Sequence, residues 1–448
     1  MTIAANLNTL TLGASDRKYG TWLAYAYLFF YYVRPQEYIP GMSALPLAGV
    51  IFLVFAIWGG IHFRMFFLKS PIVLIVLLGC AYLLSAIDAL NVNAYRITIK
   101  AFTEFFPHCL ALYILFDSKD RVTNLLKLWN VIYFFVALIT IKNGGRGPGD
   151  FTLDENDAAL ALAIGFPVCF YGYWYSGFGK KFRYFSAFTS LVILAGIVVS
   201  SSRGGFLGLI AAVLILWWFS PRKFKIALYA IIFSITMSGV VISLLPDGYI
   251  DEMQSINDTE DDTRVQRLQL WETAWEIYKD NIFVGVGVHN QRYHMFEYAR
   301  KTSWYSADPA NQIYAEQYQG KVVHSVYFQV LSETGSFGAI IYLYIMFILP
   351  IGLLKFTKIR ENETEEQKLI RFISQALIAG MGAHIVAGAF ISVAYYPHLA
   401  IWVAMYAIVK RLYIMESISD SGVTNKQHED TRPYSHKTHG FKWENQTN

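Results

Sequence analysis

Long apolar segments separated by short polar connections dominate the chain. Each is close to the roughly 17 to 25 residues that a helix needs to cross a bilayer. The predicted spans are 19–33, 44–62, 70–88, 101–116, 124–141, 157–176, 184–200, 204–219, 224–245, 325–355, 367–391 and 394–412. The pattern therefore predicts an all-α polytopic membrane protein with about 12 transmembrane helices.

The composition supports a membrane protein. Of 448 residues, 55% are hydrophobic and only 16% are charged, whereas ordinary soluble domains have about 25% charged residues. The first residues lack a basic start followed by a short apolar core, so we expect the first span to act as the export signal. The three cysteines lie in apolar segments and form neither a disulfide framework nor a metal-ligand spacing, so we expect them to serve packing. They are Cys80, Cys109 and Cys169.

The distribution of Lys and Arg predicts the orientation. Basic residues gather on one set of alternate connections, for example at 180–183 and 355–371, and are sparse on the other set. By the positive-inside rule we expect both termini to be cytoplasmic and the long polar segment before the tenth span to lie outside, which is the periplasm if the cell is Gram-negative. The formal net charge of +4 is explained by the cytoplasmic loops, and no charge block indicates nucleic-acid binding.

These assignments divide the chain into five parts. They are a cytoplasmic segment 1–18, spans one to nine over 19–245, a periplasmic loop 246–323, spans ten to twelve over 324–412, and a polar cytoplasmic tail 413–448 predicted to be disordered.

The loop is too long to be a structureless connection, since such loops rarely exceed about 15 residues. "TRVQRLQLWETAWEIYKDN" predicts an amphipathic helix whose Trp-rich face contacts a protein core or the membrane interface. "GVGVHN" at 285–290 lacks a preceding strand and a third glycine, so it is better interpreted as a tight turn than as a dinucleotide loop.

Several motifs together resemble one family. "HSVYFQVLSETGSFG" at 324–338 is similar to the signature of the O-antigen ligase and polymerase superfamily. "SSRGGFLG" at 201–208 and "RLQLWETAWEIYKDNIFVGVG" at 267–287 resemble two further family segments, and "YYVRPQEYIPG" at 31–41 resembles a subgroup of O-glycosylation ligases. The resemblance covers roughly residues 30 to 412 as an ordered set. Thr334 departs from it, because the family often has His or another polar group there.

The resemblance implies an activity at a bacterial inner membrane. It implies an inverting, metal-independent glycosyltransferase of GT-C-like architecture, without a cofactor, acting on the periplasmic side. The donor would be a glycan on undecaprenyl pyrophosphate, and the acceptor a hydroxyl of lipid A-core in lipopolysaccharide biosynthesis. A polymerase with a second prenyl-linked repeat as acceptor and a protein O-oligosaccharyltransferase use the same donor. A non-catalytic transporter of the lipid-linked glycan is a more distant alternative.

His324 is the candidate general base. An imidazole with a pKa near neutrality suits removal of a proton from an acceptor hydroxyl, an effect worth roughly 10²- to 10⁴-fold. Within the same motif Tyr327 and Gln329 are expected to orient sugar or phosphate, and Glu333 to steady the helix or His324 through a network. Four other histidines lack such a context and are interpreted as structural, namely His289, His294, His384 and His398.

Arginine side chains are the candidates for the donor pyrophosphate. A guanidinium contacts phosphate oxygens in bidentate fashion and stabilises the charge that grows as the sugar–phosphate bond breaks. Arg203 lies among small neighbours that let a headgroup approach. Arg264 and Arg267 are three residues apart on one face of the predicted loop helix and are expected to close on the same pyrophosphate.

The clustered carboxylates have ordinary explanations. The acidic run "NDTEDD" at 257–262 offers hard oxygen ligands for a divalent cation, but a solvated surface is the simpler interpretation. "LDENDAAL" at 153–160 is interpreted as the polar start of a span rather than as a glycosidase carboxylate pair. We therefore predict no metal site.

Overall fold

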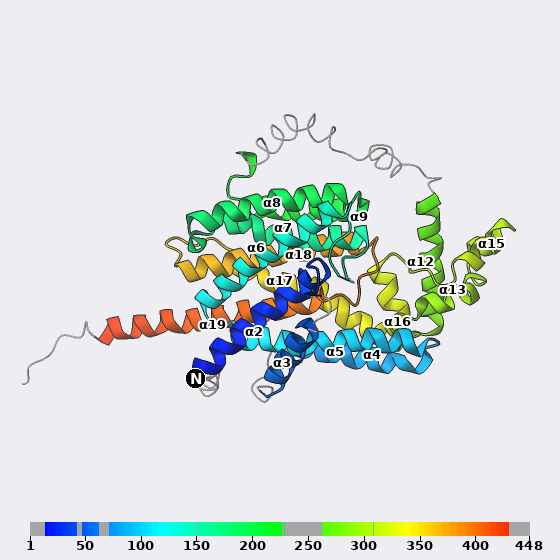
Figure 1. Cartoon of the computed structure of the whole chain (residues 1–448), viewed down its shortest axis with the longest axis horizontal. Helices are drawn as coiled ribbons and strands as arrows, with labels where there is room; N and C mark the ends of the chain where they lie inside the picture. Colours follow the sequence, from blue (N-terminus) through cyan, green and yellow to red (C-terminus); the bar gives the residue numbers. More distant parts are fainter. Residues whose placement is uncertain are drawn as a thin grey trace, which may run out of the picture.

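The computed structural model describes residues 14–42, 47–61, 71–149, 151–225, 228, 262–307 and 309–429. Every regular element within these ranges is helical, which confirms the all-α prediction (Figure 1).

The predicted spans coincide with helices, except that 224–245 lies almost entirely outside the described residues. The region of predicted spans one to nine contains α2 Ala14–Tyr32, α3 Leu47–Ile61, α4 Val73–Leu84, α5 Val92–Leu115, α6 Lys119–Lys142, α7 Glu155–Trp174, α8 Lys180–Val199 and α9 Arg203–Phe219. The last region contains α16 Val326–Leu343, a π-helical turn Tyr344–Ile348, α17 Leu349–Leu353, a 3₁₀ turn Leu354–Phe356, α18 Glu365–Gly388 and α19 His398–Glu429.

Six helices of the described residues are long and apolar enough to cross a membrane, and three shorter apolar helices accompany them. The protein is thus a multi-pass membrane protein, while the count of about 12 spans and the GT-C-like architecture stay predictions.

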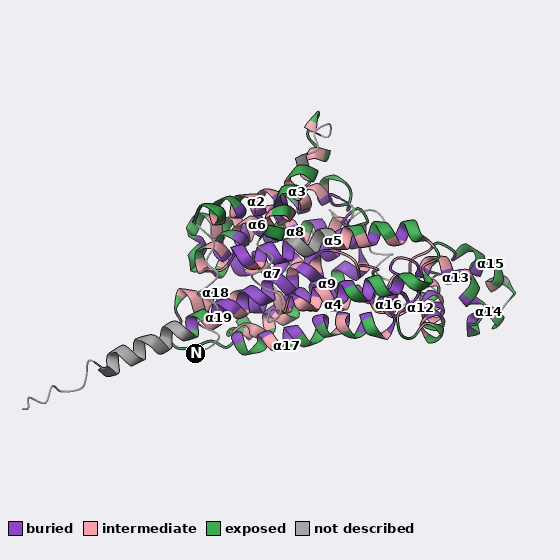
Figure 2. Ribbon diagram, turned by 90° about the horizontal axis from the view of Figure 1, so that it is seen from below, coloured by how far each residue is buried: buried purple, intermediate pink, exposed green. Residues whose placement is uncertain are grey.

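Helix α7 forms the centre of the bundle, where most of its residues are buried against α6, α8, α9 and α18 (Figure 2). Small residues permit this packing. A Cβ on Gly205 of α9 would lie 2.2 Å from the Cβ of Ala159 on α7, and a Cβ on Gly208 would lie 3.0 Å from the Ala383 carbonyl oxygen on α18. The resemblance motif "SSRGGFLG" therefore also has a packing function, since close helix approach in membranes requires small side chains.

The loop between spans nine and ten is folded. It contains α12 Asp262–Asp280, α13 Gln291–Ala299, α14 Ser303–Ala307 and α15 Ala310–Gln317, which share a small apolar core of their own around Ile277, Met295 and Trp304. These helices lie at one end of the bundle, here called the loop end, whereas α2 begins and α19 finishes at the opposite end (Figure 1).

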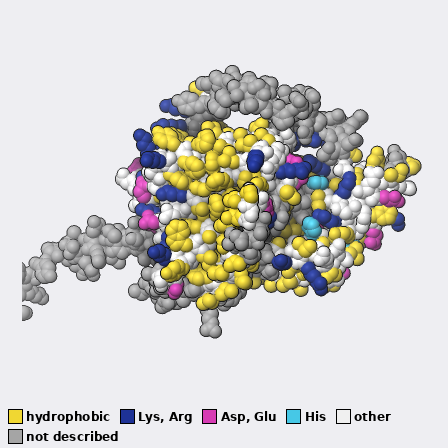
Figure 3. Space-filling model, viewed as in Figure 1, with side chains coloured by type: hydrophobic (Ala, Val, Ile, Leu, Met, Phe, Trp, Pro, Cys, Tyr) yellow, Lys and Arg dark blue, Asp and Glu magenta, His cyan; other side chains and the backbone are white. Residues whose placement is uncertain are grey.

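The types of surface side chain also change along the axis from the loop end to the opposite end. In Figure 3 hydrophobic side chains cover the middle of the bundle, whereas Lys and Arg gather toward its two ends, and histidines appear toward the loop end.

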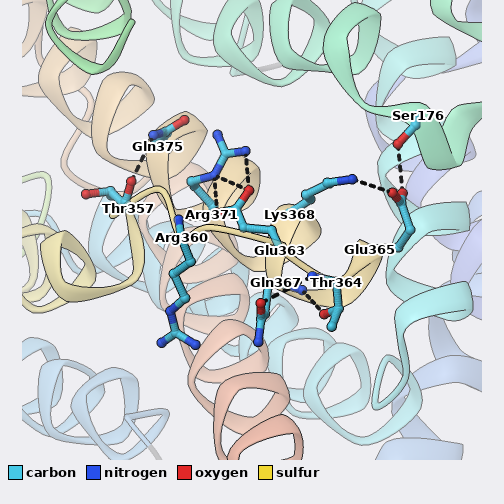
Figure 4. A network of polar contacts seen from close by, with 10 residues as sticks. All are labelled: Ser176, Thr357, Arg360, Glu363, Thr364, Glu365, Gln367, Lys368, Arg371 and Gln375. Atoms are coloured by element: carbon cyan, nitrogen blue, oxygen red, sulfur yellow. Dashed lines mark hydrogen bonds and ion pairs between the residues drawn. The ribbon is translucent and has the colours of Figure 1, made fainter. Parts of the chain in front are cut away.

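A polar network closes the end opposite the loop (Figure 4). Arg371 holds Glu363 through two nitrogens, at 2.9 Å from Nε to Oε1 and 2.7 Å from Nη2 to Oε2. Thr364 and Gln367 form a capping box at the start of α18, an arrangement that satisfies amide groups left free at a helix N-terminus. The network fixes the connection between the 3₁₀ turn Leu354–Phe356 and α18, far from the loop end.

Two boundaries differ from the sequence prediction. The tenth span, predicted as continuous over 325–355, is broken at Gly335, whose φ of 60° and ψ of −166° are not helical. Helix α19 continues to Glu429, beyond the predicted start of a disordered tail at 413. No proline occurs in this stretch before Pro433, so nothing in it breaks a helix as proline does. Residues 430–448 lie outside the described residues.

Candidate active site

His324 lies at the loop end, directly before α16. Its backbone is in the left-handed region with a φ of 51°, and the preceding carbonyl of Val323 accepts a hydrogen bond from Trp271 Nε1 at 3.1 Å. This bond fixes the segment against α12. Burial lowers the pKa of His324, the positive charges of Arg267 and Lys321 lower it further, and Asp154 raises it. The ring is therefore neutral at neutral pH and has a free lone pair for a proton.

The side chain of His324 lines a cavity of about 700 Å³. Six separate parts of the chain form its walls: the end of α2, the start of α5, the start of α7, the start of α13 with the turn before it, the segment before α16 with its first turn, and the connection between α18 and α19. The polar residues among them are Tyr31, Arg34, Asn91, Asn93, Thr98, Asp154, Asn156, Asp157, His289, Arg292, Tyr293, His324, Gln329, Ser392, Tyr395 and Tyr396. Such a concave site with converging polar groups is typical of a binding or catalytic pocket.

The start of α7 forms one wall. The Asp154 carboxylate caps the helix by accepting from the Asn156 amide at 2.9 Å. Asp157 is buried and accepts from the Tyr396 hydroxyl at 2.6 Å. Asn156 accepts from Ser202 at 2.7 Å, and Ser202 in turn caps α9. The segment is thus the polar start of a span, as predicted, and it also faces the cavity.

The predicted arginines occupy different positions around this cavity. Arg267 on α12 is half-buried and close enough to His324 to lower its pKa. Arg203 is the first residue of α9, half-buried and directly after the Ser202 that contacts the cavity wall. Arg264 is exposed on α12. None of these three is among the residues that line the cavity in the described part of the chain.

Two further arginines line the cavity. Arg34 follows α2 with a φ of 50° and contacts Glu37 at 2.6 Å. Arg292 lies in the first turn of α13, and its positive charge helps to lower the pKa of His289 to about 4, after the larger effect of burial. Both guanidinium groups are candidates for binding an anion in the cavity.

Gln329 and Tyr327, the two residues of the His324 motif that are expected to orient sugar or phosphate, differ in their surroundings. Gln329 is buried on the cavity wall and accepts from the Ala394 amide at 3.2 Å. Tyr327 donates to the Ile385 carbonyl of α18 at 2.7 Å and, in the described part of the chain, is not among the cavity-lining residues. The structure thus gives Tyr327 a contact between helices, while its predicted role toward substrate stays a prediction.

Glu333 connects the break in α16 to the loop. Its carboxylate accepts from the Tyr395 hydroxyl and, at 3.3 Å, from the Gln291 amide at the start of α13. A carboxylate at a helix N-terminus is stabilised by the free amide groups and the helix dipole. Glu333 therefore positions α13, which carries Arg292, against the helix that follows His324.

The segment 282–287 docks into the same break. The amides of Val286 and Gly287 donate to the carbonyls of Ser332 and Glu333, both at 3.0 Å, and a Cβ on Gly285 would lie 2.4 Å from the Glu333 carbonyl carbon. Gly285 and Gly287 have φ values of 69° and 97°, so "GVGVHN" forms the predicted turn. Its glycines serve this backbone contact.

Several cavity residues escaped the sequence analysis. His289 was interpreted as structural but lines the cavity, so that interpretation is incomplete. Arg34 lay inside a quoted motif, whereas nothing local distinguished Arg292 or Tyr396. The acidic run at 257–262 lies outside the described residues, apart from the backbone of Asp262. No group of three or more His, Cys, Asp or Glu side chains converges as a metal site in the described ranges.

Comparison with known families bears on the region around this cavity. Residues 188–343 match the family model described as O-antigen ligase. Over this segment the chain is similar to an O-antigen ligase domain. The match confirms the family resemblance and supports an enzyme with an O-antigen ligase-like or polymerase-like function. The matched segment includes Arg203, Arg267 and His324, whereas Arg34 and Asp157 contribute to the cavity from outside it. No curated protein matches the chain.

Proposed function

We propose that the protein is an inverting glycosyltransferase that moves a glycan from undecaprenyl pyrophosphate to a hydroxyl of lipid A-core. The observation that carries the proposal is the position of His324. It lies on the wall of a polar cavity at one end of an apolar bundle, beside a helix that bears Arg267. A reaction between a membrane-bound prenyl donor and an acceptor in water requires such a place.

The reaction proceeds by direct displacement. Neutral His324 takes the proton of the acceptor hydroxyl, and the oxygen forms a bond to the anomeric carbon. The bond from that carbon to the pyrophosphate oxygen breaks, and undecaprenyl pyrophosphate leaves with the electron pair. Attack from the side opposite the leaving group inverts the anomeric configuration.

Guanidinium groups stabilise the leaving group. Arg267 acts from α12 and Arg203 from the start of α9, with Arg264 at the outer edge of α12. Arg34 and Arg292 add positive charge inside the cavity. These groups neutralise the pyrophosphate as a divalent cation does in other transferases, so the proposed reaction is metal-independent.

The proposal includes an orientation. The loop end faces the periplasm of a bacterial inner membrane, and the opposite end, where α19 finishes, faces the cytoplasm. The positive-inside distribution supports this orientation. A transporter would require polar groups through the span interiors, whereas the polar residues that line the cavity gather at the loop end.

The test is transfer by a His324→Ala variant in cells that lack the native gene. We expect loss of the ladder of glycosylated lipid A-core bands on a gel, with protein amount and binding of the prenyl-linked donor retained, because a general base acts on the chemical step. Lys368→Gln is the control, since it removes only an ion pair with Glu365 at the opposite end of the bundle.

Normal band patterns from well-expressed His324→Ala would refute the assignment of the base. If glycan chains shorten while lipid A-core is still modified, the protein is instead a polymerase. If glycan is lost from proteins alone, it is a protein O-oligosaccharyltransferase.

A further inference from the structure

Helix α12 has two apolar faces. One is fully buried against the other loop helices through Leu270, Ala274 and Ile277. The other carries Leu268, 52% exposed, and Trp275, 43% exposed. A helix that served only as the lid of a soluble loop would need a single apolar face, so the second face indicates another apolar environment.

The position of α12 is fixed by α16. Trp271 stacks on Phe328 with ring centroids 5.5 Å apart. About two helical turns further along both helices, the Tyr278 hydroxyl lies 2.9 Å from Ser336 Oγ. The two helices therefore run side by side in the same direction, up to the break at Gly335. In Figure 1, α12 lies across the loop end, nearly perpendicular to the long helices of the bundle.

Beyond the break, α16 and its continuation present apolar side chains to the outside. The exposed residues recur every three or four positions and are Phe337, Ile340, Tyr344, Phe347, Ile351 and Leu354. They lie in a helix long and apolar enough to cross a membrane, so they face lipid. At about 1.5 Å per residue this stripe is roughly 25 Å long, close to the roughly 30 Å of a hydrocarbon core. Phe337 therefore marks one edge of that core.

The second face of α12 continues this lipid-facing stripe. Phe283 is the most exposed apolar residue of the segment after α12, with 81% of its surface exposed. Its carbonyl accepts a hydrogen bond from the Phe337 amide at 3.3 Å. Trp275 contacts Tyr278 with centroids 5.1 Å apart, and Tyr278 is bonded to Ser336. Phe283 and Trp275 are thus both held beside the start of the stripe, Phe283 through the backbone of Phe337 and Trp275 through Tyr278 and Ser336.

Charged residues flank this apolar surface. Lys301 pairs with Asp280 at 2.5 Å, and both side chains are about half exposed. Lys279 pairs with Glu276 at 2.6 Å on the flank of α12. Lys279 follows Trp275 by four residues and therefore lies on the same side of the helix, where a lysine can bury its aliphatic stem beside lipid and extend its ammonium group to the headgroups.

We infer that α12 lies in the membrane interface at the loop end, with Leu268, Trp275 and Phe283 inserted among lipid acyl chains and the Asp280–Lys301 pair in water. Tryptophan prefers this depth, because its ring is apolar while its N–H needs a polar partner. The inference is independent of catalysis. In the proposed function it means that Arg264 and Arg267 are held at headgroup depth, where a prenyl-linked pyrophosphate lies.

The test measures the depth of spin labels by electron paramagnetic resonance. The protein, with Cys80, Cys109 and Cys169 replaced by Ala, is placed in nanodiscs of phosphatidylethanolamine and phosphatidylglycerol. Single cysteines at 268, 275 and 283 carry the label. Ile340→Cys is the lipid-facing control and Lys301→Cys the water-facing control. All five positions are exposed, so labelling does not disturb the core.

We expect labels at 268, 275 and 283 to collide with oxygen as often as the label at 340, and to be shielded from a water-soluble nickel chelate. Lys301→Cys should show the reverse. If the three labels collide with the chelate as often as the label at 301, α12 stands clear of the membrane and the inference is wrong. Neither result depends on transferase activity, so the proposed function is tested separately.

Discussion

At the scale of single residues, the pKa of His324 depends on burial and on three charged neighbours. Burial, Arg267 and Lys321 lower the pKa, and Asp154 raises it. A base acts only when unprotonated, so activity is lost as the pH falls through this lowered pKa, below the ordinary value of about 6.5. The acidic limb of the pH–rate profile therefore reports the electrostatics of the cavity.

Two substitutions should move this limb in opposite directions. Lys321→Gln removes a positive charge, so the pKa of His324 rises and activity is lost at higher pH than in the wild type. Asp154→Asn removes a negative charge while keeping a good helix cap, so the limb moves to lower pH. The measurement is kcat/KM against pH for both variants. If the acidic limb of kcat/KM lies at the same pH in the wild type and both variants, His324 is not the group that titrates.

Sequence reasoning at this scale found His324 because a motif surrounds it. It did not find Asp157, Arg292 or Tyr396, because their relevance depends on contacts across the fold: Tyr396 reaches Asp157 from a connection far along the chain, at 2.6 Å. No local pattern contains such a contact.

At the scale of elements, the break in α16 shows what periodicity cannot predict. The predicted span runs continuously through the polar stretch 332–336, yet the backbone turns at Gly335, where the segment 282–287 exchanges hydrogen bonds with it. Helix positions followed from the sequence because long apolar segments have few alternatives in a membrane. The break did not, because it is imposed by a partner segment.

This docking predicts that two glycines tolerate no side chain. A Cβ on Gly335 would lie 2.4 Å from the Phe283 carbonyl carbon, and one on Gly285 equally close to that of Glu333. Gly335→Ala or Gly285→Ala should destabilise the protein by about 3 kcal/mol or more. The midpoint of thermal unfolding in detergent measures this.

Gly320 provides the matched control. It also has a positive φ, 86°, but a Cβ there meets nothing within 4 Å. Gly320→Ala should therefore cost only about 1 to 2 kcal/mol from backbone strain. Similar losses for all three variants would mean that the close contact at Gly335 contributes nothing beyond the φ value.

At the scale of the whole molecule, six parts of the chain bring positive charge and polar groups to one cavity, and arginine is the proposed leaving-group partner. Purified protein with prenyl-linked donor and lipid A-core acceptor should keep its turnover in excess EDTA. Asp261→Asn combined with Asp262→Asn should retain most of that activity. Loss of turnover in EDTA, restored by Mg or Mn, would assign the pyrophosphate to a bound cation instead of Arg203 and Arg267.

The wide sequence separation of the cavity walls has a consequence for biosynthesis. Arg34 enters the membrane near the start of translation, whereas Tyr395 and Tyr396 are made after almost every span has been inserted. The carboxylates of Glu333 and Asp157 accept hydrogen bonds from these two tyrosines, so both carboxylates lack these donors until the tyrosines have been made. A nascent chain therefore has no complete cavity, and the cavity is completed only after α18 and the connection that follows it have left the ribosome and joined the bundle.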